Sequence, residues 1–296
     1  MTLPTLCRRI IATALFAQFS SAQTLITLPH NKDGAESQAI ALPLDTEGHY
    51  VTVGVVDADV TKATAGEHKF TLVVQDSQSR CTLLKGPKVK KVPTLGSSKY
   101  LNPGSALYQK ADQSGSLLRV VSRETYFHDQ LLPLQFLRIS YNGTLPKPGQ
   151  PLYDKDGKLV ALAHQPTSDF GTGIYALPIE AITRNLEDYR ANKTLKRCWL
   201  GLHLDHLNQI PLVEGVRPES PSSKVGLQKG DVLLSLGGWP VTTYSSAINA
   251  FYYLLPGQQT DLRILRGTKV LDLKITPVAH PTYSAVPSKP SKKTGE

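Results

Sequence analysis

The strongest constraint on the fold is a series of short β-like runs, separated by turn residues, between about residue 40 and residue 178. The runs are Tyr50–Val56, His68–Val74, Leu117–Val121, Leu134–Ile139 and Lys158–Ala163. Short strands at regular spacing are typical of an all-β barrel or sandwich. Asp156-Gly157 is a dipeptide that favours a hairpin turn before the last run. The sequence therefore predicts a mainly β domain here.

After Pro178 the apolar period changes from that of a strand to that of a helix. The residues that recur at helical spacing, with charged residues between them, are Ile179, Ile182, Leu186 and Tyr189. They predict an amphipathic helix that closes a first domain, residues 23–190, before a linker at 191–198. In a second domain, residues 199–280, a helix from about Ser245 to Leu254 should end before Pro256-Gly257. Residues 281–296 hold too little apolar content to order themselves and should form a disordered tail.

The amino terminus has the features of an export signal. In residues 1–22, Arg8 and Arg9 precede an apolar run that ends in small residues. The run is too short to span a bilayer, so we expect a signal peptide, a periplasmic or secreted protein and no stable membrane span after cleavage. The net charge of +9 is spread along the chain, and the basic stretch at residues 85–91 has no interleaved aromatic residues. We therefore expect no nucleic-acid partner.

The cysteines and histidines do not form a recognisable metal site. Cys81 and Cys198 follow the signal peptide. An oxidising compartment would permit a disulfide between them, but the sequence does not decide whether it forms. Two isolated cysteines lack the ligand spacing of structural zinc, and the pairs His203/His206 and His128/Asp129 have no further ligands at a suitable spacing. We expect no metal and no cofactor.

Residues 199–278 carry a pattern of spaced glycine and apolar elements. The elements are Trp199-Leu200-Gly201-Leu202, Gly215-Val216-Arg217-Pro218, Val225-Gly226-Leu227 and Lys229-Gly230-Asp231-Val232-Leu233. The pattern resembles the PDZ domains of HtrA-type periplasmic proteases over essentially their whole length. The resemblance implies that a peptide adds as a strand, with its terminal carboxylate or side chain at backbone N–H groups of the opening loop.

The same resemblance assigns the peptide-binding residues. The opening loop and the receiving strand would contain Trp199, Leu200, Gly201, Leu202, His203 and Leu204. The helical wall of the groove would contain Ala247, Ile248 and Phe251. The alternative for each apolar residue is that it belongs only to the core.

Residues 40–190 resemble the trypsin-like domain of these proteases. The run Pro146-Lys147-Pro148-Gly149-Gln150-Pro151-Leu152 stands where the family carries G-N-S-G-G-P-L, so Pro148 occupies the position of the nucleophilic serine. The segment at 48–56 resembles G-Y-I-V-T-N-N-H-V and puts Val55 at the position of the general base. The segment at 79–85 resembles T-D-L-A-V-L-K and puts Arg80 at the position of the acid. The predicted fold class is mainly β, a trypsin-like double β-barrel followed by a PDZ domain.

The residues at these positions cannot perform the chemistry of the family. Acyl transfer by a serine needs a hydroxyl, an adjacent base and an orienting acid that act as one unit. Proline has no hydroxyl, valine cannot accept a proton, and neither Pro146 nor Pro148 has an N–H for an oxyanion hole. These substitutions predict a protein without catalytic residues that is not an enzyme, a pseudoprotease with a degenerate trypsin-like domain.

The function expected from this reasoning is binding without cleavage. The exported protein would bind peptide or protein segments, including C-terminal ones, through its PDZ groove, in a scaffold, chaperone-like or regulatory role, and an active HtrA-like paralogue is a further candidate partner. The alternative is a serine endopeptidase of the HtrA type with a rearranged active site. His49 and His164 are then candidate bases, and Ser140 and Ser168 are candidate nucleophiles.

Overall fold

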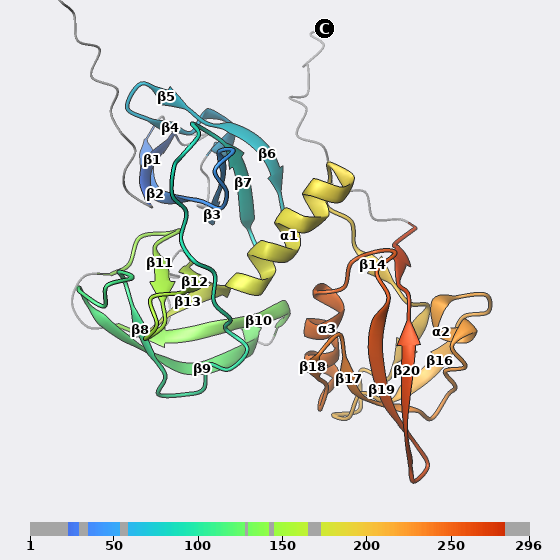
Figure 1. Cartoon of the computed structure of the whole chain (residues 1–296). Helices are drawn as coiled ribbons and strands as arrows, with labels where there is room; N and C mark the ends of the chain where they lie inside the picture. Colours follow the sequence, from blue (N-terminus) through green and yellow to red (C-terminus); the bar gives the residue numbers. More distant parts are fainter. Residues whose placement is uncertain are drawn as a thin grey trace, which may run out of the picture.

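A computed structural model describes residues 23–29, 35–53, 59–127, 130–141, 145–164 and 173–281. The predicted signal peptide and almost all of the predicted tail lie outside these ranges. Within them, no helix is long and apolar enough to cross a membrane. Figure 1 shows two β units stacked along one side of helix α1 and a separate carboxy-terminal unit on the other side.

The first unit is a seven-stranded sheet with the strand order β5-β4-β1-β2-β3-β7-β6. Its strands are β1 (Thr24–Pro29), β2 (Glu36–Pro43), β3 (His49–Val53), β4 (Thr64–Ala65), β5 (His68–Lys69), β6 (Thr71–Gln75) and β7 (Cys81–Lys85), with a short 3₁₀ helix at Val60–Lys62. Alternate residues point into the core, where the rings of Tyr50 and Phe70 meet edge to face at 5.1 Å. Phe70 interrupts the predicted run His68–Val74, because its N–H bonds the carbonyl of Ala63 instead of a neighbouring strand.

The second unit is a closed barrel with the strand order β10-β13-β12-β11-β8-β9. Its strands are β8 (Ala106–Tyr108), β9 (Leu117–Phe127), β10 (Gln130–Ser140), β11 (Pro151–Tyr153), β12 (Leu159–Ala163) and β13 (Gly173–Pro178). The predicted hairpin turn between β11 and β12 is confirmed. Gly157 adopts a φ of +71° and donates its N–H to the carbonyl of Asp154 at 3.1 Å. The left-handed conformation explains the glycine at this turn.

Helix α1 (Ile179–Asn192) confirms the predicted amphipathic helix. Its buried residues Ile179, Ile182 and Leu186 join a cluster that also contains residues of both β units. The helix thus fills the space where the two units meet. It extends two residues into the predicted linker and ends with Lys193 in the left-handed conformation, at a φ of +56°.

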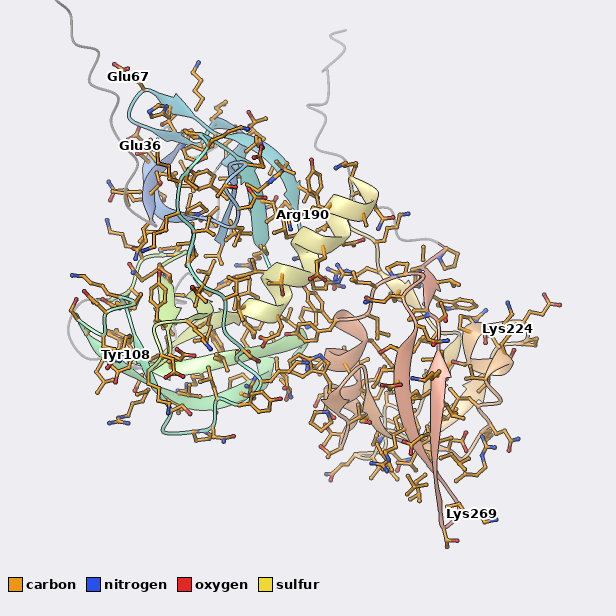
Figure 2. All side chains as sticks on the ribbon, in the orientation of Figure 1. Glu36, Glu67, Tyr108, Arg190, Lys224 and Lys269 are labelled. Atoms are coloured by element: carbon orange, nitrogen blue, oxygen red, sulfur yellow. The ribbon has the colours of Figure 1, made fainter. Side chains whose placement is uncertain are left out.

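The carboxy-terminal unit contains β14 (Cys198–Trp199), β15 (Leu202–Leu204), β16 (Val213–Val216), β17 (Val232–Leu236), β18 (Trp239–Pro240), β19 (Thr260–Arg266), β20 (Lys269–Ile275) and β21 (Val278–Ala279). Its helices are α2 (Pro221–Lys224) and α3 (Tyr244–Tyr252). The Thr243 hydroxyl accepts the Ser246 N–H and so caps the start of α3. Lys269 marks the tip of the β19–β20 hairpin in Figure 2. Two barrel-like β units followed by this mixed domain confirm the predicted fold class.

Candidate functional site

The predicted groove would lie between β15 and α3 of the carboxy-terminal unit, whose residues Leu202, Leu204 and Phe251 share one apolar cluster. β15 pairs with β16 on one side, and no other strand pairs with it within the described residues. The half-buried residues Tyr244, Ile248 and Phe251 are spaced by four and three positions, so they share one face of α3. The free edge of β15 has unpaired backbone groups that an added strand can use.

The loop before β15 is held by its carbonyl groups. The carbonyls of Leu200 and Gly201 accept the N–H groups of Ser222 and Arg217 at 2.9 and 2.8 Å. In the described part of the chain, the N–H groups of Leu200 and Gly201 donate to no protein acceptor. Gly201 has a φ of +73°, and a Cβ on it would lie 2.2 Å from the Cβ of Ser220. The loop therefore requires glycine and presents free amides, an arrangement suited to a carboxylate.

The structure places the predicted peptide-binding residues in different environments. Leu200, Leu202 and Leu204 belong to the same apolar cluster as Phe251, whereas the His203 side chain is 72% exposed and pairs with Glu214 at 3.0 Å. Ala247 is completely buried and therefore packs in the core. Trp199 is half-buried in the β14–β21 pair, and Ile248 is half-buried on α3. Their roles in binding remain predictions.

The segment around Pro148 ties the two β units together. The Pro148 carbonyl accepts the Ile40 N–H of β2 at 2.8 Å, and the Gly149 N–H donates to the Ala163 carbonyl of β12 at 2.9 Å. A Cβ on Gly149, whose φ is +79°, would lie 2.0 Å from the Ile40 carbonyl oxygen. Position 148 thus lies where the two units meet, but it supplies neither a hydroxyl nor an N–H.

Of the positions matched to the acid and the base, the structure describes only the acid position, Arg80. Arg80 is exposed, has a φ of +54° and immediately precedes β7. Val55 lies outside the described residues. The predicted acid position therefore holds a solvent-exposed cation.

His49 has the nearest local geometry to a base with an orienting acid. Its Nδ1 lies 2.6 Å from the Asp45 carboxylate, which also accepts a bond from Arg190 at 2.7 Å. Burial raises the pKa of Asp45, but the His49 backbone N–H and the Arg190 side chain lower it further, so the pKa is about 2. Figure 2 shows Arg190 on α1 beside the first β unit. Asp45 is therefore ionised across the physiological pH range.

The other candidates that the structure describes, Ser140 and His164, belong to the second β unit. Ser140, on β10 of the second unit, donates its hydroxyl to the Arg119 carbonyl at 3.4 Å. His164 is nearly buried and contacts the Phe136 ring edge to face, with centroids 5.6 Å apart. Ser168 lies outside the described residues.

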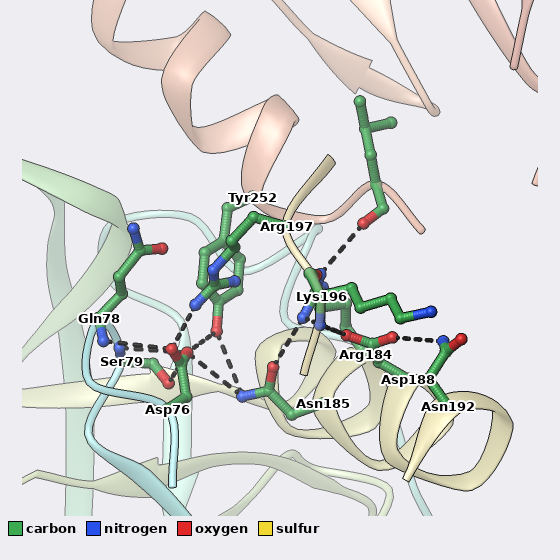
Figure 3. Close-up of polar contacts among 11 residues, drawn as sticks. Asp76, Gln78, Ser79, Arg184, Asn185, Asp188, Asn192, Lys196, Arg197 and Tyr252 are labelled. Atoms are coloured by element: carbon green, nitrogen blue, oxygen red, sulfur yellow. Dashed lines mark hydrogen bonds and ion pairs between the residues drawn. The ribbon is translucent and has the colours of Figure 1, made fainter. Parts of the chain in front are cut away.

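A buried polar network, which the sequence did not predict, joins the carboxy-terminal unit to the rest (Figure 3). Its centre is Asp76, which accepts bonds from the Ser79 and Tyr252 hydroxyls at 2.6 Å each and from Arg197. Asn185 of α1 lies 3.4 Å from the same carboxylate. Burial raises the pKa of Asp76, but the Arg197 charge and these hydrogen bonds lower it overall. The carboxylate is therefore ionised, and it is contacted by residues of the first β unit, α1, α3 and the segment after α1.

The described structure shows two free thiols and no cluster of metal ligands. Cys81 and Cys198 are free thiols, and burial raises the pKa of each to about 12. Among the residues described, no group of three or more His, Cys, Asp or Glu side chains is placed to hold a metal ion.

Residues 198–276 match the PDZ domain family. The chain is 26% identical over 292 residues to a probable periplasmic serine endoprotease DegP-like of Ectopseudomonas mendocina, covering 88% of this chain and 61% of the relative. A protein of the same name from Pseudomonas fulva is 26% identical over 81% of this chain and 56% of its own length. The chain thus spans about three fifths of the length of these relatives.

Solved structures give the same architecture. The HtrA-type protease AlgW with tripeptide superposes with a TM-score of 0.58 at 18% identity, over 88% of this chain and 94% of the other. The serine endoprotease from Yersinia pestis gives a TM-score of 0.51 at 15% identity, over 88% and 94%. The chain is similar in architecture to these HtrA-type proteases. It consists of a trypsin-like double barrel followed by a PDZ domain, and the names of the relatives agree with the predicted periplasmic or secreted location.

The prediction that this HtrA-like chain is not an enzyme is contradicted. The relatives that match 81–88% of the chain are named serine endoproteases, which points to a protease. The prediction assumed that the catalytic groups must occupy the matched positions 55, 80 and 148. Serine-protease chemistry is defined by the geometry of its groups and recurs with different chain positions, so the loss of side chains at fixed positions does not exclude it.

Proposed function

We propose that this chain is a periplasmic serine endopeptidase of the HtrA type with a rearranged active site, and that its PDZ domain binds segments of proteins. The proteolytic part is supported by the relatives named as serine endoproteases, which match most of the chain. The peptide-binding part is supported by one observation above all, the free edge of β15 beside the half-buried face of α3. The solved AlgW structures contain a tripeptide or a decapeptide.

In the proposed complex, the loop before β15 determines the direction of the bound peptide. A terminal carboxylate at the free amides of Leu200 and Gly201 lies at the amino-terminal end of β15. The preceding peptide residues then run along β15 toward Leu204, so the added strand is antiparallel. Main-chain hydrogen bonds to β15 provide affinity, while alternate side chains face Phe251 and Ile248 of α3 and provide selectivity.

A rearranged site needs the same three roles as any serine peptidase. Asp45 and His49 are the candidates for orienting acid and base, a choice supported by the 2.6 Å contact between the ionised carboxylate and Nδ1 of the imidazole. The hydroxyl would come from another part of the chain, and Ser140 and Ser168 are the candidates. The oxyanion donors must be backbone N–H groups other than positions 146 and 148, which are prolines.

Cleavage of an unfolded protein by the purified mature chain tests the proteolytic part. We expect fragments to accumulate, and a fluorophosphonate probe to add one label per chain by intact mass. Both signals should be lost in one of the variants Ser140→Ala and Ser168→Ala, and reduced in His49→Ala or His164→Ala. An absence of fragments and of label, under conditions in which an HtrA-type protease cleaves the same substrate, would refute the proposal.

Peptide binding is tested separately with a matched pair of glycine variants. Gly201→Trp should abolish binding of a peptide selected from a random library, because no side chain fits beside Ser220. Gly215→Trp serves as the size-matched control, because nothing lies within 4 Å of a Cβ added there. The thermal transition of the barrel domain should be unchanged in both. Equal binding by the Gly201→Trp variant and the parent would rule out the assigned groove.

A further inference from the structure

The carboxy-terminal unit contains a pocket of about 190 Å³ beside the carboxy-terminal end of α3. It is lined by Gly237 and Trp239, at the turn between β17 and β18, and by residues 253–255 and 258–260, between the end of α3 and the start of β19. Among the described residues, none of those assigned to the peptide groove lines it. One water needs only roughly 10–15 Å³ of such space, so the pocket admits a small organic molecule.

A ring stack and a backbone hydrogen bond hold the lining in place. The Gly237 N–H donates to the Asp261 carbonyl at 2.9 Å. The Trp239 indole stacks on the Tyr253 ring, with centroids 4.3 Å apart and planes 15° from parallel. Because Tyr253 covers one face of the indole, the Lys99 ammonium, 4.6 Å from the ring centroid, lies over the other face. The indole can therefore offer a ligand only its edge, which carries the N–H.

Two polar groups of the lining have no hydrogen-bond partner. Trp239 is only 8% exposed, and a buried indole N–H usually has an acceptor. In the described part of the chain, nothing accepts a hydrogen bond from Nε1 of Trp239, and nothing pairs with the hydroxyl of Thr260. The Trp239 nitrogen is not completely enclosed, so a ligand can reach it. The pocket thus holds a donor and a hydroxyl that remain available.

The rest of the polar lining is uncharged. Gln258 and Gln259 carry exposed amides, which both donate and accept hydrogen bonds. No Asp, Glu, Lys or Arg lines the pocket within the described residues, so a charged ligand would lose hydration without gaining a partner. A neutral molecule with several hydroxyls, each able to donate and to accept, matches this set of groups.

We propose that this pocket binds a neutral sugar ring. The Trp239 N–H donates to one sugar hydroxyl, while the Thr260 hydroxyl and the amides of Gln258 and Gln259 bind others. The site is separate from the peptide groove, and the proposal holds whether or not the chain cleaves proteins. Helix α3 lies on the side of the carboxy-terminal unit that faces β10 (Figure 1). A bound sugar would therefore contact Trp239 close to the junction between the domains.

The experiment uses the full mature chain with isotope-labelled tryptophan. The two tryptophans give two indole N–H signals in an NMR spectrum, and the signal lost in Trp239→Phe belongs to Trp239. We expect glucose and N-acetylglucosamine to shift this signal, with a Kd on the order of 1 mM for a single sugar ring. Glucosamine, a cation, and glucuronate, an anion, should bind more weakly by about fivefold or more.

Three variants connect the shift to the pocket. Thr260→Val removes the hydroxyl but keeps a branched side chain that suits a strand, and it should weaken sugar binding about fivefold. Gln259→Ala changes an exposed residue, so it should weaken binding without changing the thermal transition. Thr242→Val, at an exposed threonine outside the pocket, is the matched control and should bind as the parent does.

Each other outcome overturns the proposal. If neither indole signal moves at a sugar concentration about ten times the expected Kd, or if only the Trp199 signal moves, the pocket does not bind sugar. Equal shifts with neutral and charged sugars would show a general effect of solute. Unchanged binding by both Thr260→Val and Gln259→Ala would place the sugar elsewhere. Because neither cleavage nor peptide binding is measured, failure here leaves the proposed function intact.

Discussion

The substitution Tyr252→Phe removes one hydroxyl from the buried network and leaves the packing unchanged. The lost group donates to the Asp76 carboxylate at 2.6 Å and lies 3.3 Å from the Asn185 amide. The ring keeps its place beside Arg197, whose guanidinium lies 4.6 Å from the ring centroid. Hydrogen bonds to charged groups contribute about 1.5–3 kcal/mol, and Ser79 still serves the same carboxylate oxygen. We therefore expect Tyr252→Phe to lower the free energy of unfolding of the PDZ domain by about 2 kcal/mol.

The natural fluorescence of the chain reports this change. The only tryptophans in the sequence are Trp199 and Trp239, and both belong to the PDZ domain. Urea unfolding followed by tryptophan fluorescence should show an earlier midpoint for Tyr252→Phe. Tyr244→Phe, in the same helix, is the control, because in the described structure its hydroxyl makes no hydrogen bond. Its midpoint should match that of the parent.

A double-mutant cycle decides whether the effect passes through Asp76. Asp76→Asn alone should destabilise the chain, because Arg197 loses its buried partner. Combined with Tyr252→Phe, the two losses should overlap by about 1 kcal/mol or more, since they remove the same hydrogen bond. Strictly additive losses, or a change below about 0.5 kcal/mol for Tyr252→Phe, would refute the reasoning.

Two further predictions concern the barrels. Gly149→Ala should destabilise the double barrel by about 3 kcal/mol, because the new Cβ would lie 2.0 Å from the Ile40 carbonyl oxygen. An unchanged thermal transition would show that the contact between Gly149 and Ile40 is not rigid. The folded-state pKa of Asp45, about 2, lies below its ordinary value of 3.8, so its bonds to His49 and Arg190 stabilise the fold above about pH 4 and are lost as the pH falls toward about 2. The stability difference between the parent and Asp45→Asn should therefore shrink across that interval in urea titrations, and a constant difference would contradict this assignment.

The sequence predicted the elements whose signal is local. Strand β12 and the helices α1 and α3 lie within a few residues of their predicted bounds. Strands β9 and β10 extend beyond the predicted runs Leu117–Val121 and Leu134–Ile139, and β8 and β13 were not predicted. β1 was not predicted, although its burial alternates over Thr24–Pro29, because it precedes the series of runs that begins at about residue 40. The confirmed elements were predictable because the period of apolar residues that defines them is a property of neighbouring positions in the sequence.

The candidate site was less predictable because its contacts are not local. Tyr252 and Arg197 reach Asp76 across 176 and 121 residues of sequence, and no spacing rule connects positions so far apart. Asp45 and His49 are only four residues apart, so their pairing could have been predicted from the sequence, but it was not. The conclusion about catalysis was wrong for a related reason, since it treated matched positions as if they were the spatial arrangement of the site.

Helix α3 contacts the rest of the chain with some of its residues and forms one wall of the proposed groove with others. Asn249 accepts the Gln135 N–H of β10, and Tyr252 enters the buried network, so one face of the helix is committed to the barrel. The half-buried residues Tyr244, Ile248 and Phe251 form a different face of the helix, which belongs to the proposed groove. In the proposed groove, peptide preference can therefore diverge among descendants of this chain at these three positions, whereas changes at Asn249 or Tyr252 would weaken the contacts that join the domains.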